Sequence, residues 1–511
     1  MTDSTKLAGL CCLVALVLVV YQAIGIIYNL LFHPLRKYPG PWHWGASRAF
    51  LTVSTIRGRY VHQIKDLHRQ YGHVVRIAPN ELSFTDERAW NDICGATKAA
   101  PYGMKKDERL NDLVGGDATN PDLSKEKADM IHTRIRRSLA PAFSRSSVRQ
   151  QSPLINSHVD EMVAVLSESA KQGQTVDMCR IYAFTMYDSF SDIFLGESMN
   201  LLGDPATRPW VDSMVGFAKA TTTLAALSHY WVLRLLIGLL LKTMGNGSRD
   251  AFMNPCLDRF DRRLQRKDGG GSGRHDLVHL ALESSKQQVS AKELRDFSPF
   301  LMVGGGETMG SLLPCLTYLL LKHPRAMQRV TREVREAFDG GGGGQDDITM
   351  DRVLRLPYLG ACIDEALRMY PPVAQGNERV VPEGGAAVCG DHLPGGTIVV
   401  VSQLSAYRQK RNFFRPDHFV PERWLPEAGP EFANDRKAVF KPFSVGPQNC
   451  FGQEVAHYTL RLVMVRLLLS FKMKLCQESD AKNTWGGQLA VYNVWMKPPL
   501  NVELELAGVK G

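Results

Sequence analysis

The sequence predicts a mainly helical protein with small β-sheets, an α+β fold, preceded by one N-terminal transmembrane helix. Three observations predict this class. Residues 123–370 are mostly helical in pattern, whereas short runs within 74–84, 379–401 and 487–505 have the residue types of strands. A long uncharged stretch occupies the N-terminus. With 511 residues and 44% hydrophobic content, the chain can bury one large core.

The N-terminal stretch predicts a membrane anchor. Leu7 to Phe32 carries no charged residue, and this run exceeds the roughly 20 apolar residues that cross a bilayer. A cleaved secretory signal is the alternative, but no small-residue cleavage site follows. Arg36 and Lys37 come directly after the stretch, which by the positive-inside rule puts the rest of the chain in the cytosol. We therefore expect an anchor at residues 1–32.

The rest of the chain is expected to form a hinge and one domain. The proline-rich segment 33–45 predicts a stiff, non-helical stalk. Residues 46–511 then form a single domain. The glycine-rich stretches 269–273 and 340–344 lack the Lys-Ser/Thr of a phosphate-binding loop, so we interpret both as surface linkers.

The charge and the cysteines narrow the classes of partner. The net charge of +9 and the pI of about 9.0 favour an acidic partner or an anionic membrane surface. We expect no nucleic acid partner, because no recognition motif accompanies the basic residues. The ten cysteines include no CxxC pair, which argues against a zinc site or a disulfide framework and favours a reducing, cytosol-facing compartment.

One cysteine stands out in the stretch FSVGPQNCFGQEVA, residues 443–456. A cysteine taken blindly is most often core filler. Gly446 and Gly452 bracket Cys450, however, and a helical pattern follows it. The sulfur is thus expected ahead of a helix N-terminus, where backbone N–H groups favour the thiolate. A thiolate is a strong axial ligand for iron, and Phe443 is placed to shield it from water.

The residues of this stretch resemble the haem-binding loop F-x-x-G-x-R-x-C-x-G of the cytochrome P-450 superfamily. Phe443, Gly446, Cys450 and Gly452 match the pattern. The resemblance implies a haem b group with Cys450 as the axial iron ligand. The chain departs at Gln448, where the family has an arginine that donates to a haem propionate. An amide keeps the hydrogen bond but loses the charge, which removes about 1–2 kcal/mol of haem anchoring.

A second signature is DEALR, residues 364–368. Glu365 and Arg368 stand three residues apart, on one face of a predicted helix. The alternative is an ordinary solvated helix face, on which this spacing is common. Arg423 in PERW lies at the separation that the family resemblance predicts. The resemblance implies that these three residues form a buried structural cluster that supports the cysteine loop, and a buried charge network must be fully paired.

A third signature lies in a long predicted helix. A capping box at Ser290 and Glu293 predicts its start, and it should run to about Lys322. Three consecutive glycines interrupt its middle, in LMVGGGETMGSLL at residues 301–313. Each glycine costs about 1 kcal/mol relative to alanine. The alternative to a functional notch is a close helix crossing without chemistry.

The family counterpart of this notch is A/G-G-x-D/E-T-T. Gly304, Gly305, Glu307 and Thr308 fill its positions, and Met309 replaces the second threonine. The resemblance implies that Glu307 and Thr308 are catalytic and relay protons above the haem.

Further matches extend the resemblance to about residues 20–505. His132, Arg136 and Arg379 correspond to positions that bind haem propionates in the family. Segments such as VRIAPNELSF, FRPDHFVPERWL and KPPL are most similar to filamentous-fungal enzymes of secondary metabolism, close to the isotrichodermin hydroxylase type.

The resemblance implies a membrane-bound haem-thiolate monooxygenase of the endoplasmic reticulum. Its substrate is expected to be a lipophilic secondary-metabolite intermediate, a terpenoid, polyketide or alkaloid. The chain has no flavin or nicotinamide fingerprint, so NADPH electrons are expected from a separate cytochrome P-450 reductase, with cytochrome b5 as a further candidate donor. Arg134, Arg137 and Lys441 are candidates for the docking face, and ordinary solvated charges are the equal alternative.

Two other functions stay open at this point. Haem-thiolate dehydratases or isomerases that do not use dioxygen commonly lack the alcohol at position 308, so Thr308 favours monooxygenation. A haem-binding protein without turnover is the other alternative, for which Gln448 and Met309 are the arguments. The substrate pocket is expected near residues 98–120, 205–240, Val373–Gln375 and Tyr492, none of which has a residue pattern that identifies a substrate.

Overall fold

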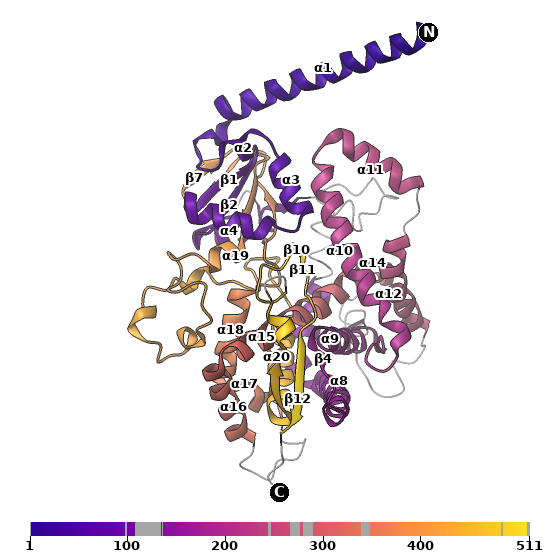
Figure 1. Ribbon diagram of the computed structural model, residues 1–511, viewed down its shortest axis with the longest axis vertical. Coiled ribbons are helices and arrows are strands. Elements are labelled where there is room, and N and C mark those ends of the chain that lie inside the picture. The colour runs from indigo at the N-terminus through magenta and orange to yellow at the C-terminus, as the bar shows by residue number, and fades with distance from the viewer. Residues whose placement is uncertain are drawn as a thin grey trace.

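The computed structural model describes residues 2–97, 100–107, 134, 136–243, 247–265, 276–278, 290–338, 348–481 and 484–507. The predicted mainly helical fold is confirmed (Figure 1). The α-helices in these ranges are α1 (Thr2–Leu31), α2 (Trp42–Ala46), α3 (Ala49–Ile56), α4 (Tyr60–Tyr71), α5 (Arg88–Cys94), α8 (Arg145–Lys171), α9 (Met178–Leu195), α10 (Pro209–Ser228), α11 (Trp231–Thr243), α12 (Gly247–Gln265), α14 (Ala291–Met302), α15 (Thr308–Lys322), α16 (Pro324–Phe338), α17 (Met350–Leu354), α18 (Pro357–Met369), α19 (Gln403–Tyr407) and α20 (Gln453–Ser470).

The strands form small sheets beside the helices. They are β1 (Val74–Ala78), β2 (Glu81–Phe84), β3 (Lys105–Lys106), β4 (Val176–Asp177), β5 (Arg379–Val380), β6 (Ala386–Val388), β7 (Asp391–Leu393), β8 (Ile398–Val401), β9 (Phe471–Leu475), β10 (Val491–Tyr492), β11 (Val494–Trp495) and β12 (Asn501–Leu506). The largest described sheet has the order β1-β2-β8-β5-β3. Its first two strands pair antiparallel as a hairpin, which confirms the strands predicted within 74–84.

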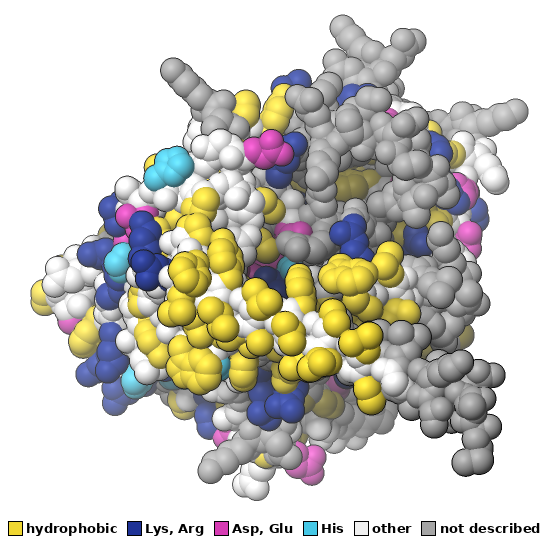
Figure 2. Space-filling view, turned by 90° about the horizontal axis from the view of Figure 1, so that it is seen from above, with side chains coloured by type: hydrophobic (Ala, Val, Ile, Leu, Met, Phe, Trp, Pro, Cys, Tyr) yellow, Lys and Arg dark blue, Asp and Glu magenta, His cyan; other side chains and the backbone are white. Residues whose placement is uncertain are grey.

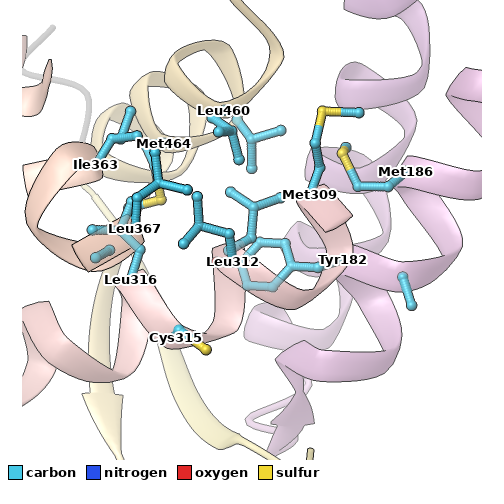
Figure 3. Close-up of a cluster of buried hydrophobic side chains, with 14 of the residues drawn as sticks. Tyr182, Met186, Met309, Leu312, Cys315, Leu316, Ile363, Leu367, Leu460 and Met464 are labelled. Atoms are coloured by element: carbon cyan, nitrogen blue, oxygen red, sulfur yellow. The ribbon is translucent and has the colours of Figure 1, made fainter. Parts of the chain in front are cut away.

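The core lies where four helices meet. Figure 3 shows side chains from α9, α15, α18 and α20 that point toward one another. Met186, Leu312, Leu367 and Met464 are all buried in this cluster. Close-packed apolar side chains of this kind resist small displacements. The core therefore gives a rigid frame to α15 and α20, the two helices that border the candidate site.

The N-terminal residues form helix α1, which extends away from the rest of the molecule (Figure 1). Among the residues searched, those that the structure describes, no helix is both long enough and apolar enough to cross a membrane. The predicted membrane span is therefore not confirmed, and the division into an anchor, a hinge and one domain stays a prediction.

The hinge segment 33–45 is not the non-helical stalk that its prolines predict. Pro34 begins a 3-10 turn, and Pro41 precedes helix α2. Proline is well tolerated where a helix begins, because the N–H that it lacks has no partner there in any case. A Cβ on Gly40 would lie 2.5 Å from the carbonyl oxygen of Arg76, so the segment packs closely against β1. The two glycine-rich linkers lie outside the described residues.

Candidate active site

Cys450 lies in a tight loop that ends at the start of helix α20. The backbone N–H of Cys450 donates to the carbonyl oxygen of Phe443 at 2.8 Å. Gly446 has φ 78°, and a Cβ there would lie 2.1 Å from the carbonyl oxygen of Cys94, so this position requires glycine. The glycine turn thus brings the loop against α5 and places the Cys450 thiol on a cavity.

The thiol is accessible from the cavity, although protein atoms surround the loop. Burial raises the pKa of Cys450, whereas a hydrogen bond from the Gly452 N–H and the Arg136 guanidinium oppose that rise. Both opposing groups favour the thiolate. A bound cation at the sulfur would act in the same direction, so the loop is suited to hold a metal-bound thiolate.

The cavity beside Cys450 has a volume of about 350 Å³. Helices α14 and α15 border it opposite the cysteine loop. Most of its lining is apolar, and it includes Phe190, Phe297, Phe300 and Leu301. Thr308 supplies a hydroxyl to the same cavity. The site is therefore a largely apolar chamber between one thiol and one alcohol, the kind of pocket that binds lipophilic ligands.

The glycine notch is a π-helical turn. The capping box at Ser290 and Glu293 is present, and α14 continues through a π-turn at Val303–Glu307 into α15. The predicted helix to Lys322 is thus confirmed, with its distortion at the glycines. The Thr308 hydroxyl donates to the carbonyl oxygen of Gly304 at 2.7 Å, which satisfies a carbonyl in the widened turn.

Glu307 is turned toward a second cavity. Its buried carboxylate accepts hydrogen bonds from Ser311 Oγ at 2.7 Å and from the Tyr187 hydroxyl at 3.2 Å, and it forms an ion pair with Lys497. Lys497 Nζ also donates to Ser311 Oγ at 2.7 Å. Glu307 and Lys497 both line this second cavity, which has a volume of about 620 Å³.

Sequence reasoning missed Lys497, Ser311 and Tyr187. Lys497 belongs to the KPPL segment that contributed to the family resemblance, but its partner stands 190 residues earlier in the chain. Only Ser311 could have been found, because it lies one helical turn after Glu307 on the same helix.

The residues expected at the haem propionates lie around the cysteine loop. Arg136 lines the cavity and donates both to the backbone and to the side-chain oxygen of Asn449. Arg379 is buried, and its Nη1 donates to Gln448 Oε1 at 2.7 Å. Gln448 itself lines the cavity. His132 lies outside the described residues.

The residues around the Cys450 loop fit a haem. Within the described ranges, no group of three His, Cys, Asp or Glu side chains gathers to hold a metal ion. A thiolate at an apolar chamber suits an iron ion whose other ligands come from a macrocycle. A porphyrin also carries two carboxylates, and the guanidinium groups of Arg136 and Arg379 lie beside the cysteine loop. One sulfur, an apolar chamber and nearby cations match that chemistry.

Glu365, Arg368 and Arg423 lie together and are completely buried. Arg368 donates two hydrogen bonds to the Glu365 carboxylate, at 2.7 and 2.8 Å, and Arg423 Nε donates at 3.2 Å. Burial alone would raise the pKa of Glu365, but the two guanidinium groups outweigh it and lower the pKa. Trp424 also donates to Glu365, at 2.9 Å, and its ring packs 4.5 Å from that of Phe440, so the cluster contacts the segment just before the cysteine loop.

The three cations predicted for a docking face differ in their surroundings. Arg134 forms an ion pair with Glu293, which belongs to the capping box of α14. Arg137 is exposed and Lys441 is half-buried. A cation that is already paired contributes less to the attraction of an acidic partner, so Arg134 is the weakest of the three candidates.

Comparisons with known proteins agree with this geometry. A family model described as cytochrome P-450 matches residues 39–504. The chain is 36% identical to averantin hydroxylase of Dothistroma septosporum over 95% of this chain and 90% of the relative. It is 33% identical to trichothecene C-15 hydroxylase of Fusarium sporotrichioides over 95% of this chain and 96% of the relative. A cytochrome P-450 monooxygenase of Aspergillus aculeatus is 34% identical over 94% of this chain and 89% of the relative. The protein therefore belongs to the cytochrome P-450 family of haem-thiolate enzymes and is a monooxygenase.

Proposed function

We propose that this protein is a membrane-bound monooxygenase that hydroxylates a lipophilic secondary-metabolite intermediate, a terpenoid, polyketide or alkaloid. The observation that carries the proposal is the apolar chamber of about 350 Å³ whose lining includes both Cys450 and Thr308. Relatives named for the hydroxylation of averantin and of a trichothecene support a lipophilic substrate. The presence of Thr308 favours monooxygenation over rearrangement.

The cysteine loop holds the cofactor. Cys450 would bind the haem iron, and the Gly452 N–H and Arg136 would favour its thiolate form against the opposing effect of burial. Arg136, together with Arg379 and its partner Gln448, would hold the propionates. The bound haem supplies the activation of dioxygen, which thiolate donation favours. Phe443 packs beside His457, with 5.1 Å between their rings, and helps to exclude water from the loop.

Thr308 and Glu307 serve proton delivery. The Thr308 hydroxyl lies in the chamber and is held by the carbonyl oxygen of Gly304. Glu307 faces the neighbouring cavity of about 620 Å³, so protons enter from that side. Lys497 holds the Glu307 carboxylate on that side until a proton is transferred.

Membrane attachment and electron supply complete the proposal. Figure 2 shows hydrophobic side chains gathered across the face that carries α1. Trp42 and Trp231 are 72% and 66% exposed, and tryptophan is enriched at membrane interfaces. We assign the enzyme to the endoplasmic reticulum membrane with its catalytic part in the cytosol.

NADPH electrons arrive through a separate reductase, with cytochrome b5 as a second candidate donor. Arg137 and Lys441 contribute to the docking of this partner.

The experiment that tests the function uses the full chain in microsomes with reductase. Cys450→Ala is expected to abolish both turnover and the reduced carbon monoxide spectrum that is characteristic of thiolate ligation. Cys476→Ala is the matched control, because Cys476 lies far along the chain in the turn after β9, and it should leave the spectrum unchanged. A normal spectrum in Cys450→Ala would refute the ligand assignment. Turnover of a lipophilic substrate without oxygen would instead support a dehydratase or isomerase.

A further inference from the structure

A separate polar pocket adjoins the thiol chamber. It has a volume of about 160 Å³ and lies between helix α3, the C-terminal part of α10 and the turn at residues 375–378. Tyr60, Thr52, Thr222 and Gln375 are among its lining residues. Asn377 lines both this pocket and the chamber beside Cys450, so the two spaces are neighbours at this residue.

Two buried polar atoms at this pocket have no hydrogen-bond partner among the described residues. The Tyr60 side chain is 8% exposed, and its hydroxyl makes no hydrogen bond with any described residue. The Gln375 carbonyl oxygen Oε1 is likewise buried without a described partner, whereas its amide nitrogen donates to Asn493. Buried polar groups in native proteins are nearly always paired. A hydroxyl donor and a carbonyl acceptor at one pocket therefore suggest a ligand that supplies an acceptor and a donor.

The charges around the pocket disfavour an anionic ligand. Arg48 lines the pocket, but its Nη1 lies 2.7 Å from the buried carboxylate of Glu81. Asp107 and Glu378 also line the pocket and act electrostatically on Arg48. Three carboxylates, those of Glu81, Glu378 and Asp107, thus act on Arg48, and Lys106 also lines the pocket. An added carboxylate would meet a field that is already negative, whereas a neutral hydroxyl would not.

Burial and the nearby carboxylates of Glu81 and Glu378 raise the pKa of Tyr60 well above its ordinary value. The phenol is therefore protonated at any physiological pH and remains a hydrogen-bond donor. An alcohol oxygen can accept from Tyr60, and the alcohol proton can be donated to Gln375 Oε1. A hydrocarbon can do neither.

We propose that this pocket binds the neutral hydroxyl end of an elongated substrate whose apolar part lies in the chamber beside Cys450. The inference rests on the proposed monooxygenase function. It narrows the substrate to lipophiles that carry an alcohol or phenol at the end remote from the site of oxidation. Tyr60 and Gln375 are then specificity-determining residues, because they set which part of the molecule reaches the haem.

The test is an optical titration of the purified, haem-loaded ferric protein with 1-alkanols of graded length, the matching n-alkanes and the matching fatty acids. The change in the haem spectrum reports binding. A good neutral hydrogen bond changes affinity by about three- to tenfold. Wild type should bind the best alkanol at least threefold more tightly than the matching alkane or acid. Tyr60→Phe and Gln375→Leu should each weaken alkanol binding by about three- to tenfold and leave alkane binding unchanged.

The matched control is Tyr71→Phe, at the other end of the helix that carries Tyr60, and it should change neither affinity. An unchanged ratio of alkanol to alkane affinity in Tyr60→Phe would overturn the inference. Fatty acids that bind as tightly as alkanols, or a wild-type haem spectrum that no alkanol perturbs, would also overturn it. A protein that shows no thiolate haem spectrum at all would count instead against the proposed function.

Discussion

The buried carboxylate of Glu307 is paired with Lys497, a residue from a distant part of the chain. Its side chain and that of Lys497 are only 3% and 9% exposed. A charge in such surroundings is tolerated when it is paired and hydrogen-bonded, and removal of one partner leaves the other buried without compensation. Lys497, Ser311 and Tyr187 together meet this requirement for Glu307.

We predict that Lys497→Met lowers the free energy of unfolding by about 3–5 kcal/mol, because it leaves the buried Glu307 carboxylate without its cation. The double variant Lys497→Met/Glu307→Gln should recover a large part of this loss. Urea unfolding of the haem-free protein measures both. Lys474→Met is the control, since Lys474 pairs with Glu503 on the surface, and its unfolding should match wild type. If the double variant is no more stable than Lys497→Met, the ion pair does not explain the burial.

The sequence predicts site residues that stand close together along the chain in one motif. It does not predict side chains from distant segments that become paired only in the folded protein. Cys450 and Gly446 stand in one loop, so their pattern is visible along the chain. Lys497 and Asn449 reach Glu307 and Arg136 only after folding. The hydrogen bond from Arg379 to Gln448 is of the same kind, and it brings a guanidinium beside Gln448.

At the scale of elements, the π-turn at Val303–Glu307 explains why three glycines stand in one helix. A Cβ on Gly305 would lie 2.2 Å from the Phe190 ring, and one on Gly306 would lie 2.3 Å from the Tyr187 ring. A Cβ on Gly304 would meet no atom within 4 Å. Two of the glycines therefore allow α9 to approach, and the third opens the chamber beside Cys450.

We predict that Gly305→Ala lowers the free energy of unfolding by about 1–3 kcal/mol, because the Phe190 ring must move in a packed core. Gly304→Ala is the matched control. It should leave stability unchanged or slightly higher, since alanine favours helical structure and the added methyl group enters open space. Thermal or urea unfolding of both variants checks the difference. Equal destabilisation by the two substitutions would show that backbone strain, rather than the ring contact, requires the glycines.

Helices and strands with a local sequence signal could also be predicted, whereas pairing between distant strands could not. The capping box and the hairpin at 74–84 are local signals, and both are present. The sequence does not predict that β4, β12 and β9 form one sheet. Its central strand pairs with strands that begin at Val176 and Phe471. Short edge strands carry little signal of their own, because their partners supply most of their stability.

At the scale of the whole molecule, helix α18 places two neighbouring carboxylates in opposite environments. Arg368 and Arg423 hold the pKa of Glu365 below its usual value, against the effect of burial. Burial raises the pKa of Asp364 to about 6, and Arg461 opposes this only in part. The two residues should therefore affect the stability of the protein with opposite dependence on pH.

Between about pH 4 and pH 6 the folded protein binds a proton at Asp364 that the unfolded chain has released, so this residue makes stability fall as pH rises through that range. We predict that Asp364→Asn flattens this part of the pH profile and raises the free energy of unfolding at pH 7 by about 1–3 kcal/mol. Glu365→Gln should instead lower it by about 3–5 kcal/mol, because the buried guanidinium of Arg368 loses its carboxylate and that of Arg423 keeps only Asp435. Urea unfolding of haem-free protein between pH 4 and pH 8 measures both effects. A pH profile for Asp364→Asn that parallels wild type would show that Arg461 compensates the buried carboxylate completely. A gain in stability in Glu365→Gln would mean that the cluster does not depend on the charge of Glu365.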